Sequence, residues 1–189
     1  MSFRPVQCLE ARRSVRWQGL GGEGLEHLTI SATAETVHAE AVVIGARGGT
    51  PYGVTYKIAC DLDFSVRSFA VSTTDGRGLE MTRRDGAWYD SRRGHLPDFD
   101  GCIDIDLAGT PFTNTLPIRR AAWQTGTEHG FTMLYVSFGT FEPSVDAQTY
   151  ACLGPRLFRY KAADRSFTAD LPVDEDGLVM DYPTLFQRL

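Results

Sequence analysis

The sequence predicts an all-β fold: an antiparallel roll or incomplete barrel of about a dozen strands, with little helix. Three observations support this prediction. Apolar residues alternate with polar ones along much of the chain, Asp-Gly and Gly-Gly pairs interrupt the pattern at short intervals, and apolar residues at helical spacing are scarce. Alternation places successive side chains on opposite faces, as in a strand. Regularly spaced turn signals are typical of sandwiches and barrels.

The alternation is clearest in residues 37–44, where the four residues of one face are valine or alanine. Residues 54–60, 69–71 and 103–107 alternate in the same way. Side chains that switch faces with a period of two indicate half-buried strands. Further stretches that we expect to be strands are Leu25–Ala32, Leu79–Arg84, Ala87–Asp90, Ile118–Gln124, Thr132–Phe138, Leu157–Ala162, Thr168–Val173 and Leu178–Tyr182.

Turn residues separate these stretches. Asp-Gly suits tight hairpin turns because both of its residues can adopt positive φ. The best helix candidate is Ser144–Leu153, where Val145, Thr149 and Cys152 would share a face, although the same residues could equally form a strand. The turn signals are Gly21-Gly22, Gly48-Gly49, Asp75-Gly76, Asp85-Gly86, Asp100-Gly101 and Asp176-Gly177.

The number of strands predicts a curled sheet. A flat sheet of this size would leave two open edges and a bare apolar face, whereas twist makes large sheets curl. A curled sheet closes either on a solid core or around a hollow that can hold a ligand. The strand count leaves both outcomes open.

Composition narrows the classes of function. A length of 189 residues suits one domain spanning residues 1–189. The net charge of −5 argues against nucleic acid as a partner. We find no apolar run near the roughly 20 residues of a membrane span and no signal-peptide pattern. We therefore expect a cytoplasmic protein whose four cysteines are free thiols, and the oligomeric state is left open.

Polar residues that could form a binding site are densest between residues 100 and 120. Two aspartates would project from the same face of one strand. A loop bracketed by prolines follows, and loops of mixed polarity often contact ligands. Two arginines come next, in a stretch predicted as a strand, where they would point to opposite faces. The candidate ligand-binding residues of this segment are Asp104, Asp106, Thr113, Asn114, Arg119 and Arg120.

Two interpretations of these charges remain open. In the functional one, Arg119 or Arg120 pairs with one of the aspartates inside a partly buried polar site that holds a headgroup. In the structural one, the pair is a salt bridge that fixes the strand register, as ion-pair networks often do without any ligand. A buried carboxylate needs a partner in either case.

Aromatic residues supply the apolar half of the predicted site. Trp17, Tyr56 and Tyr160 lie on or beside predicted strands and are candidate ligand contacts. Indole and phenol rings suit a cavity with an apolar body and a polar mouth. The alternative for each of them is plain packing in the core.

Enzyme chemistry is weakly signalled, and whether the protein is an enzyme stays uncertain. The four histidines share no metal-ligand spacing, and neither a GxSxG elbow nor a P-loop is present, so we expect no metal and no cofactor. Asp104 and Asp106 would have Cα atoms about 6.5–7 Å apart on a strand. Because glycosidases use paired carboxylates, a hydrolase acting on a glycoside or a lipid-linked sugar is the alternative to binding alone.

Two runs of the chain resemble a known family. TPFTNTLPIRR at residues 110–120 and VDEDGLVMDYPTLFQRL at residues 173–189 resemble the bacterial glycolipid-binding family that was formerly a domain of unknown function. Phe64 and Thr184 depart from its pattern, where we would expect tryptophan and glycine. Supporting matches are Trp17 with Gly22-Glu23, Tyr56 with Asp61, Ser65-Val66-Arg67, Gly86 with Trp88, Asp100-Gly101-Cys102 with Asp104 and Asp106, Gln148 with Tyr150, and Arg159-Tyr160.

The resemblance implies a spiral β-roll, similar in shape to the periplasmic carriers of lipoproteins, and binding of a glycolipid or a related amphiphile. We therefore predict that the chain binds an amphipathic small molecule in the hollow of the roll. The acyl part would lie on the apolar concave face. One arginine of the pair at residues 119–120, together with Asp104, Asp106, Thr113 and Asn114, would hold the polar headgroup.

Overall fold

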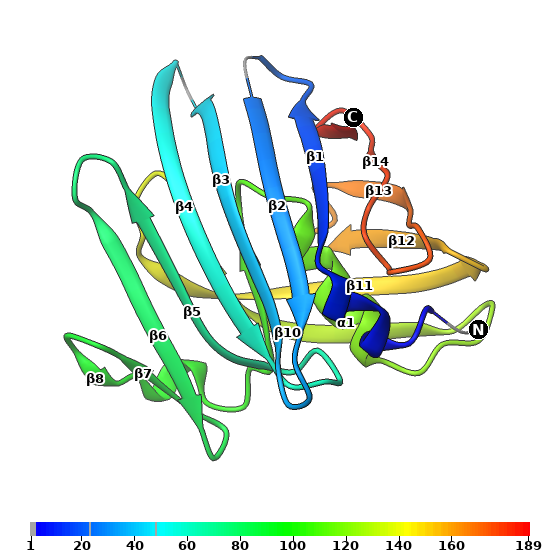
Figure 1. The fold of residues 1–189 in the computed structure, drawn as a ribbon, viewed down its shortest axis with the longest axis horizontal. Coiled ribbons are helices and arrows are strands. Elements are labelled where there is room, and N and C mark those ends of the chain that lie inside the picture. Colours follow the sequence, from blue (N-terminus) through cyan, green and yellow to red (C-terminus); the bar gives the residue numbers. More distant parts are fainter. Residues whose placement is uncertain (1–2, 23, 48) are drawn as a thin grey trace.

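The computed structural model describes residues 3–22, 24–47 and 49–189, and Glu23 and Gly48 of the predicted motifs lie outside them. The described residues form two β-sheets, and the chain is mostly β, as predicted. The large sheet is antiparallel throughout (Figure 1). Its strands, in spatial order, are β14 (Asp181–Tyr182), β15 (Phe186–Arg188), β1 (Arg13–Gly19), β2 (Gly24–Ala32), β3 (Val37–Arg47), β4 (Thr50–Cys60), β5 (Val66–Thr73), β6 (Gly78–Arg84), β7 (Ala87–Asp90) and β8 (Gly94–His95).

The second sheet runs across the back of the large one, with its strands steeply inclined to those of the large sheet (Figure 1). Its strands, in spatial order, are β13 (Thr168–Pro172), β12 (Leu157–Ala162), β11 (Pro143–Gly154), β10 (Glu128–Val136) and β9 (Asp104–Leu107). The pair of β9 and β10 is parallel, unlike the antiparallel pairing that we predicted throughout. Parallel pairing needs a long crossover, which residues 108–127 provide.

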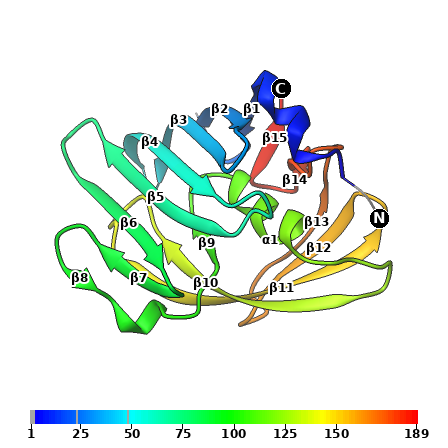
Figure 2. The same ribbon diagram turned by 60° about the horizontal axis from the view of Figure 1, so that its bottom comes forward.

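Part of that crossover, including its helical turns, lies between the two sheets (Figure 2). It contains the 3-10 helix η3 (Phe112–Asn114) and the short helix α1 (Thr115–Arg120). Phe112 and Leu116 join the core of the large sheet, while Ile118 joins a second apolar cluster under β11 and β12. The roll is therefore closed partly on a solid core. The two other short helices are η1 (Val6–Ala11) and η2 (Pro97–Phe99).

The strand that we predicted at Ile118–Gln124 is wrong, because α1 occupies its first half. Pro117 is the third residue of this helix. In the first turn of a helix the backbone N–H groups have no acceptor within the helix. A proline, which has no N–H group, is therefore tolerated there. The correction matters for the site, because the two arginines at the end of α1 do not alternate across a strand.

The helix candidate at Ser144–Leu153 forms strand β11 instead. This strand pairs on both sides, with β10 and with β12, so that Tyr150 lies opposite His129 and Tyr160. Pairing with two neighbours outweighs the weak helical pattern, because local preference alone rarely decides an element inside a sheet. The predicted strand at Leu178–Tyr182 is formed only at its last two residues.

Several turns have the backbone that the sequence predicts. Asp85 and Gly86, between β6 and β7, both have positive φ, at 52° and 83°, as a two-residue hairpin turn of the primed type requires. Phe64 and Thr184 also have positive φ, at 69° and 67°. Glycine adopts this region without steric cost, which gives a physical reason for the glycine expected at residue 184.

Candidate binding cleft

A cleft of about 580 Å³ lies between the large sheet and the second sheet. Its residues come from the ends of β3 and β4, from β9 and the segment that follows it, from β10 and β12, from the loop between β12 and β13, and from the hairpin of β14 and β15. The volume falls within the range of roughly 300–1,000 Å³ that is usual for small-molecule sites. The filling of the roll by the crossover thus leaves space at one end.

Aromatic rings form much of the lining of this cleft. Tyr160 lies 6.1 Å from Phe167 and 6.2 Å from Tyr182, measured between ring centroids, and Tyr182 lies 6.3 Å from Phe186. We refer to these four residues as the aromatic wall. Tyr182 and Phe186 are directly opposite in the hairpin of β14 and β15, a position in which cross-strand rings pack together. Tyr52 and Tyr135 also line the cleft.

Asp106 is the ionisable acid among the described residues that line the cleft. Thr113 Oγ1 donates a hydrogen bond to its Oδ1 at 3.0 Å, and Gln148 Nε2 donates to its Oδ2 at 2.7 Å. Gln148 Nε2 also donates to Asp146 at 2.9 Å. Burial raises the pKa of Asp106, the two hydrogen bonds oppose that rise, and the nearby charge of Asp146 adds to it.

Asn114 contributes a carboxamide to the same end of the cleft. Its Nδ2 donates to the carbonyl oxygen of Pro111 at 3.1 Å, and its Oδ1 accepts a hydrogen bond from Tyr150 Oη at 2.8 Å. These bonds fix the orientation of the amide before any ligand arrives. A group held in this way loses little conformational entropy when it binds.

Glu26 lies beside the cleft and was not among the predicted site residues. It projects inward from β2 and is 2% exposed. Tyr56 Oη and Thr110 Oγ1 donate to its Oε1 at 2.5 and 2.8 Å, and Thr110 lines the cleft. Burial raises the pKa of Glu26 to about 8, against the lowering effect of these two hydrogen bonds. The carboxyl group is therefore largely protonated at neutral pH.

The predicted pairing of an arginine with an aspartate does occur, between Arg120 and Asp104. Arg120 Nε and Nη2 donate to the two carboxylate oxygens at 3.1 and 2.5 Å. Asp104 is 1% exposed and does not belong to the lining of the cleft. The cleft therefore presents one of the two carboxylates that the hydrolase hypothesis requires, and this arginine is engaged in an internal pair.

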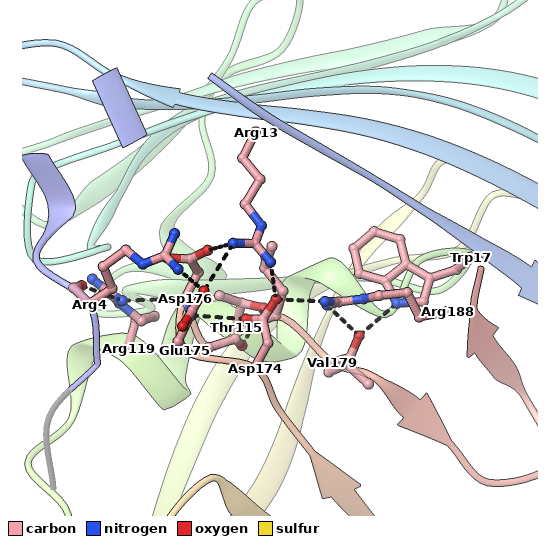
Figure 3. A network of polar contacts seen from close by, with 12 residues as sticks. Arg4, Arg13, Trp17, Thr115, Arg119, Asp174, Glu175, Asp176, Val179 and Arg188 are labelled. Carbon is pink, nitrogen blue, oxygen red and sulfur yellow. Dashed lines mark hydrogen bonds and ion pairs between the residues drawn. The ribbon is translucent and has the colours of Figure 1, made fainter. Parts of the chain in front are cut away.

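A second group of charges ties both ends of the chain to the loop after β13 (Figure 3). Arg13 and Arg188 donate to Asp174 Oδ2 at 2.9 and 2.6 Å, and Arg13 Nη1 lies 2.5 Å from Asp176 Oδ2. Arg4 Nε lies 3.6 Å from Asp176 Oδ1. We refer to these five residues as the terminal clasp.

Two predicted site residues belong to the surroundings of the terminal clasp. Trp17 is fully buried, and its indole N–H donates to the carbonyl oxygen of Val179 at 2.7 Å (Figure 3). Arg119 donates to the backbone of this region and lies over the rings of Phe3 and Phe64, at 5.2 and 4.7 Å. Both side chains are placed as packing elements, away from the cleft.

Three of the nine predicted ligand contacts line the cleft: Asp106, Asn114 and Tyr160. Thr113 donates a hydrogen bond to Asp106, and Tyr56 donates one to Glu26. The residues of the cleft and its surroundings that were not among the predicted ligand contacts are Glu26, Thr110, Gln148, Phe167, Tyr182 and Phe186. Glu26 had a usable signal, because an acid occupies an inward position in the alternating pattern of β2, which is otherwise apolar.

The described residues contain no group of three or more His, Cys, Asp or Glu side chains arranged to hold a metal ion. Among the same residues, every helix is too short or too polar to cross a membrane.

The comparisons with known proteins agree with this fold. A solved structure described as a DUF1089 family protein from Pseudomonas aeruginosa is 37% identical to the chain, covers 88% of it, and matches with a TM-score of 0.76 over 92% of its own length. No curated protein matches. The sequence model of the family described as "Putative glycolipid-binding" matches residues 14–188. The chain therefore belongs to this family, as the resemblance of its motifs predicted.

Proposed function

We propose that this protein binds an amphipathic, sugar-bearing molecule in the cleft between its two sheets. The observation that carries the proposal is the division of the cleft into an aromatic wall and a polar end. Aromatic faces and a few fixed polar groups are the usual composition of a small-molecule site. The description of the family as glycolipid-binding supports the same class of ligand.

The polar end offers groups that suit sugar hydroxyls. Asp106 is a hydrogen-bond acceptor, Asn114 offers a carboxamide, and Thr110 offers a hydroxyl. The apolar part of the ligand would pack against the rings of the aromatic wall, since rings bury large apolar areas while phenol oxygens stay near polar groups. This arrangement revises the headgroup hypothesis: Arg119 and Arg120 already have internal partners.

A cleft-filling substitution tests the proposal. Ala162 lines the cleft, whereas Ala147, on the neighbouring strand, is exposed. Isothermal titration with octyl β-glucoside below its micellar concentration should give binding to the native protein and to Ala147→Trp. Ala162→Trp should lose it, because the indole occupies the space of the ligand. Native mass spectrometry of freshly purified protein should also show retained or added amphiphile.

Two outcomes would contradict the proposal. One is that the native protein binds neither the alkyl glucoside nor any co-purified amphiphile. The other is that Ala162→Trp and Ala147→Trp bind equally well while both keep the native melting temperature, since the ligand would then lie outside the cleft.

We also propose a cytoplasmic protein made of one domain. The four cysteines, Cys8, Cys60, Cys102 and Cys152, are free thiols, which favours a reducing compartment. Burial raises the pKa of the Cys60 thiol, so it is protonated and poorly reactive.

A further inference from the structure

We propose that the headgroup bound in the cleft carries an ammonium group, for which Asp106 is the counter-ion and the aromatic wall is the surrounding surface. This inference rests on the proposed function and makes it more specific, because it states the charge of the ligand. The shared chemistry is the ammonium group, whether it belongs to an amino sugar or to a simple alkyl ammonium compound.

The described lining of the cleft includes an acid and no basic side chain. The chain contains 17 arginines and two lysines, yet none of them is among the described residues that line the cleft. Asp106 contributes the formal charge of that lining. A phosphate, sulfate or carboxylate headgroup would meet a carboxylate in a partly dry site, which costs free energy. The lining therefore favours neutral or positively charged groups.

The hydrogen bonds that Asp106 accepts come from uncharged side chains. Its two hydrogen-bond donors, Thr113 and Gln148, are neutral. Gln148 also holds Asp146, so the nearest charge to Asp106 along this hydrogen-bond chain is another acid. By contrast, buried Asp104 has the bidentate arginine Arg120. A carboxylate with no cation of its own gains most from a ligand that brings one.

The aromatic wall adds a surface that attracts cations. The faces of aromatic rings attract a cation within about 6 Å of the ring centroid. Tyr160, Phe167 and Tyr182 form a cluster in which each ring lies 6.0–6.2 Å from the next. Carboxylates also act on these rings, since Asp106 and Asp146 help to raise the pKa of Tyr160 after the larger effect of burial. Rings and carboxylates thus create a negative potential on the same side.

A charge series of octyl glycosides tests the inference. The series consists of the octyl glycosides of glucose, glucosamine and glucuronic acid, which share chain and ring and differ in one charged group. We expect the glucosamine compound to bind about tenfold or more tightly than the glucose compound, the effect of one charge-assisted hydrogen bond. The glucuronic acid compound should bind most weakly. Titration calorimetry at pH 7 measures all three affinities.

Two variants locate the effect. In Asp106→Asn the preference for the amine should fall to less than about twofold, because the counter-ion is lost while the shape is kept. Glu80→Gln removes the same charge from an exposed position on β6, outside the cleft lining, and should leave the preference unchanged. Octyltrimethylammonium is the last probe: binding as tight as that of the glucosamine compound assigns the site to ammonium groups in general, and weaker binding assigns it to amino sugars.

The outcomes separate the two proposals. Equal binding of the glucose and glucosamine compounds, or tightest binding of the glucuronic acid compound, would overturn the inference and leave the proposed function intact. Binding of none of the three, together with the absence of any co-purified amphiphile, would refute the proposed function itself. A preference for the amine that persists in Asp106→Asn, with the melting temperature unchanged, would also overturn the assignment of Asp106.

Discussion

The terminal clasp and the cleft both contain carboxylates that are largely buried, but the partners of these carboxylates differ. In the clasp, Asp174 and Asp176 face Arg13, and Asp174 also faces Arg188. In the cleft, Asp106 faces a threonine and a glutamine. Nearly all of the charge in the clasp is satisfied within the chain, while the charge in the cleft is not.

This difference distinguishes a brace from a site. Charges that pair internally across distant parts of the chain hold those parts together and leave little for a ligand to bind. The charge of an acid that is oriented only by neutral donors is not neutralised within the protein, so it can still attract a cation of a ligand. The sequence alone shows aspartates near arginines in both regions, so the comparison depends on which of them meet in space.

The largest expected effect breaks the clasp. Asp174→Asn should lower the free energy of unfolding by about 3–5 kcal/mol, because Arg188, whose side chain is 14% exposed, loses its carboxylate partner. Urea denaturation followed by fluorescence measures this change. The same substitution in the cleft, Asp106→Asn, should change the free energy of unfolding by less than about 1 kcal/mol, because it removes no ion pair.

Equal destabilisation by these two substitutions would remove the distinction between the regions. An internal control is Glu175→Gln at the rim of the clasp. The Glu175 side chain is 42% exposed, so its pairing with Arg4 should contribute less than about 1 kcal/mol.

A smaller effect concerns Glu26, the acid beside the cleft. Its pKa is about 8 in the folded protein, against an ordinary value of 4.5. Between these values the folded state binds more protons than the unfolded state, so stability falls as the pH rises. The loss is up to about 1.4 kcal/mol per pH unit, or about 2.5 kcal/mol between pH 5 and pH 7.

Glu26→Gln tests that contribution, because the amide keeps the acceptor for Tyr56 and Thr110 and cannot ionise. Denaturation curves at pH 5, 6, 7 and 8 should show a flatter decline for Glu26→Gln than for the native protein. If both proteins lose stability in parallel, the carboxyl group ionises as readily in the folded state as in the unfolded chain.

The smallest expected effect is at Thr184, in the turn between β14 and β15. This residue is exposed and has φ of 67°, a conformation that is strained for a β-branched side chain. Thr184→Gly should raise the free energy of unfolding by up to about 1 kcal/mol. Thr132→Gly, at an exposed position within β10, should lower it instead, because glycine weakens a strand. A loss of stability in both variants would contradict this account.

Prediction from sequence succeeded where the signal was local. The alternation in residues 37–44 and 54–60 lies within β3 and β4, and the Asp85-Gly86 signal marks a turn with positive φ at both residues. It failed at Ile118–Gln124, where the packing of the crossover between two sheets makes helix α1. The sequence left a strand and a helix equally open at Ser144–Leu153. Pairing with the two neighbouring strands, β10 and β12, makes this segment the strand β11.

Of the predicted ligand contacts, Asp106, Asn114 and Tyr160 line the candidate cleft, and they were predicted because polar and aromatic residues stand out in an apolar pattern. The same reasoning included Trp17 and Arg119, which are equally conspicuous and belong to the surroundings of the clasp. Residue type identifies groups that need a partner, but it does not name the partner.

The amino-acid sequence by itself determined the β fold, the positions of most turns and the family, because each follows from periodicity, backbone preference or a continuous motif. Only the tertiary structure decided which carboxylates are neutralised. Arg120 reaches Asp104 across 16 residues and Arg13 reaches Asp174 across 161, whereas the cleft brings Asp106 beside rings from β12, β14 and β15. Distances between charges are set by strand pairing across the whole chain, and electrostatic energy depends on those distances.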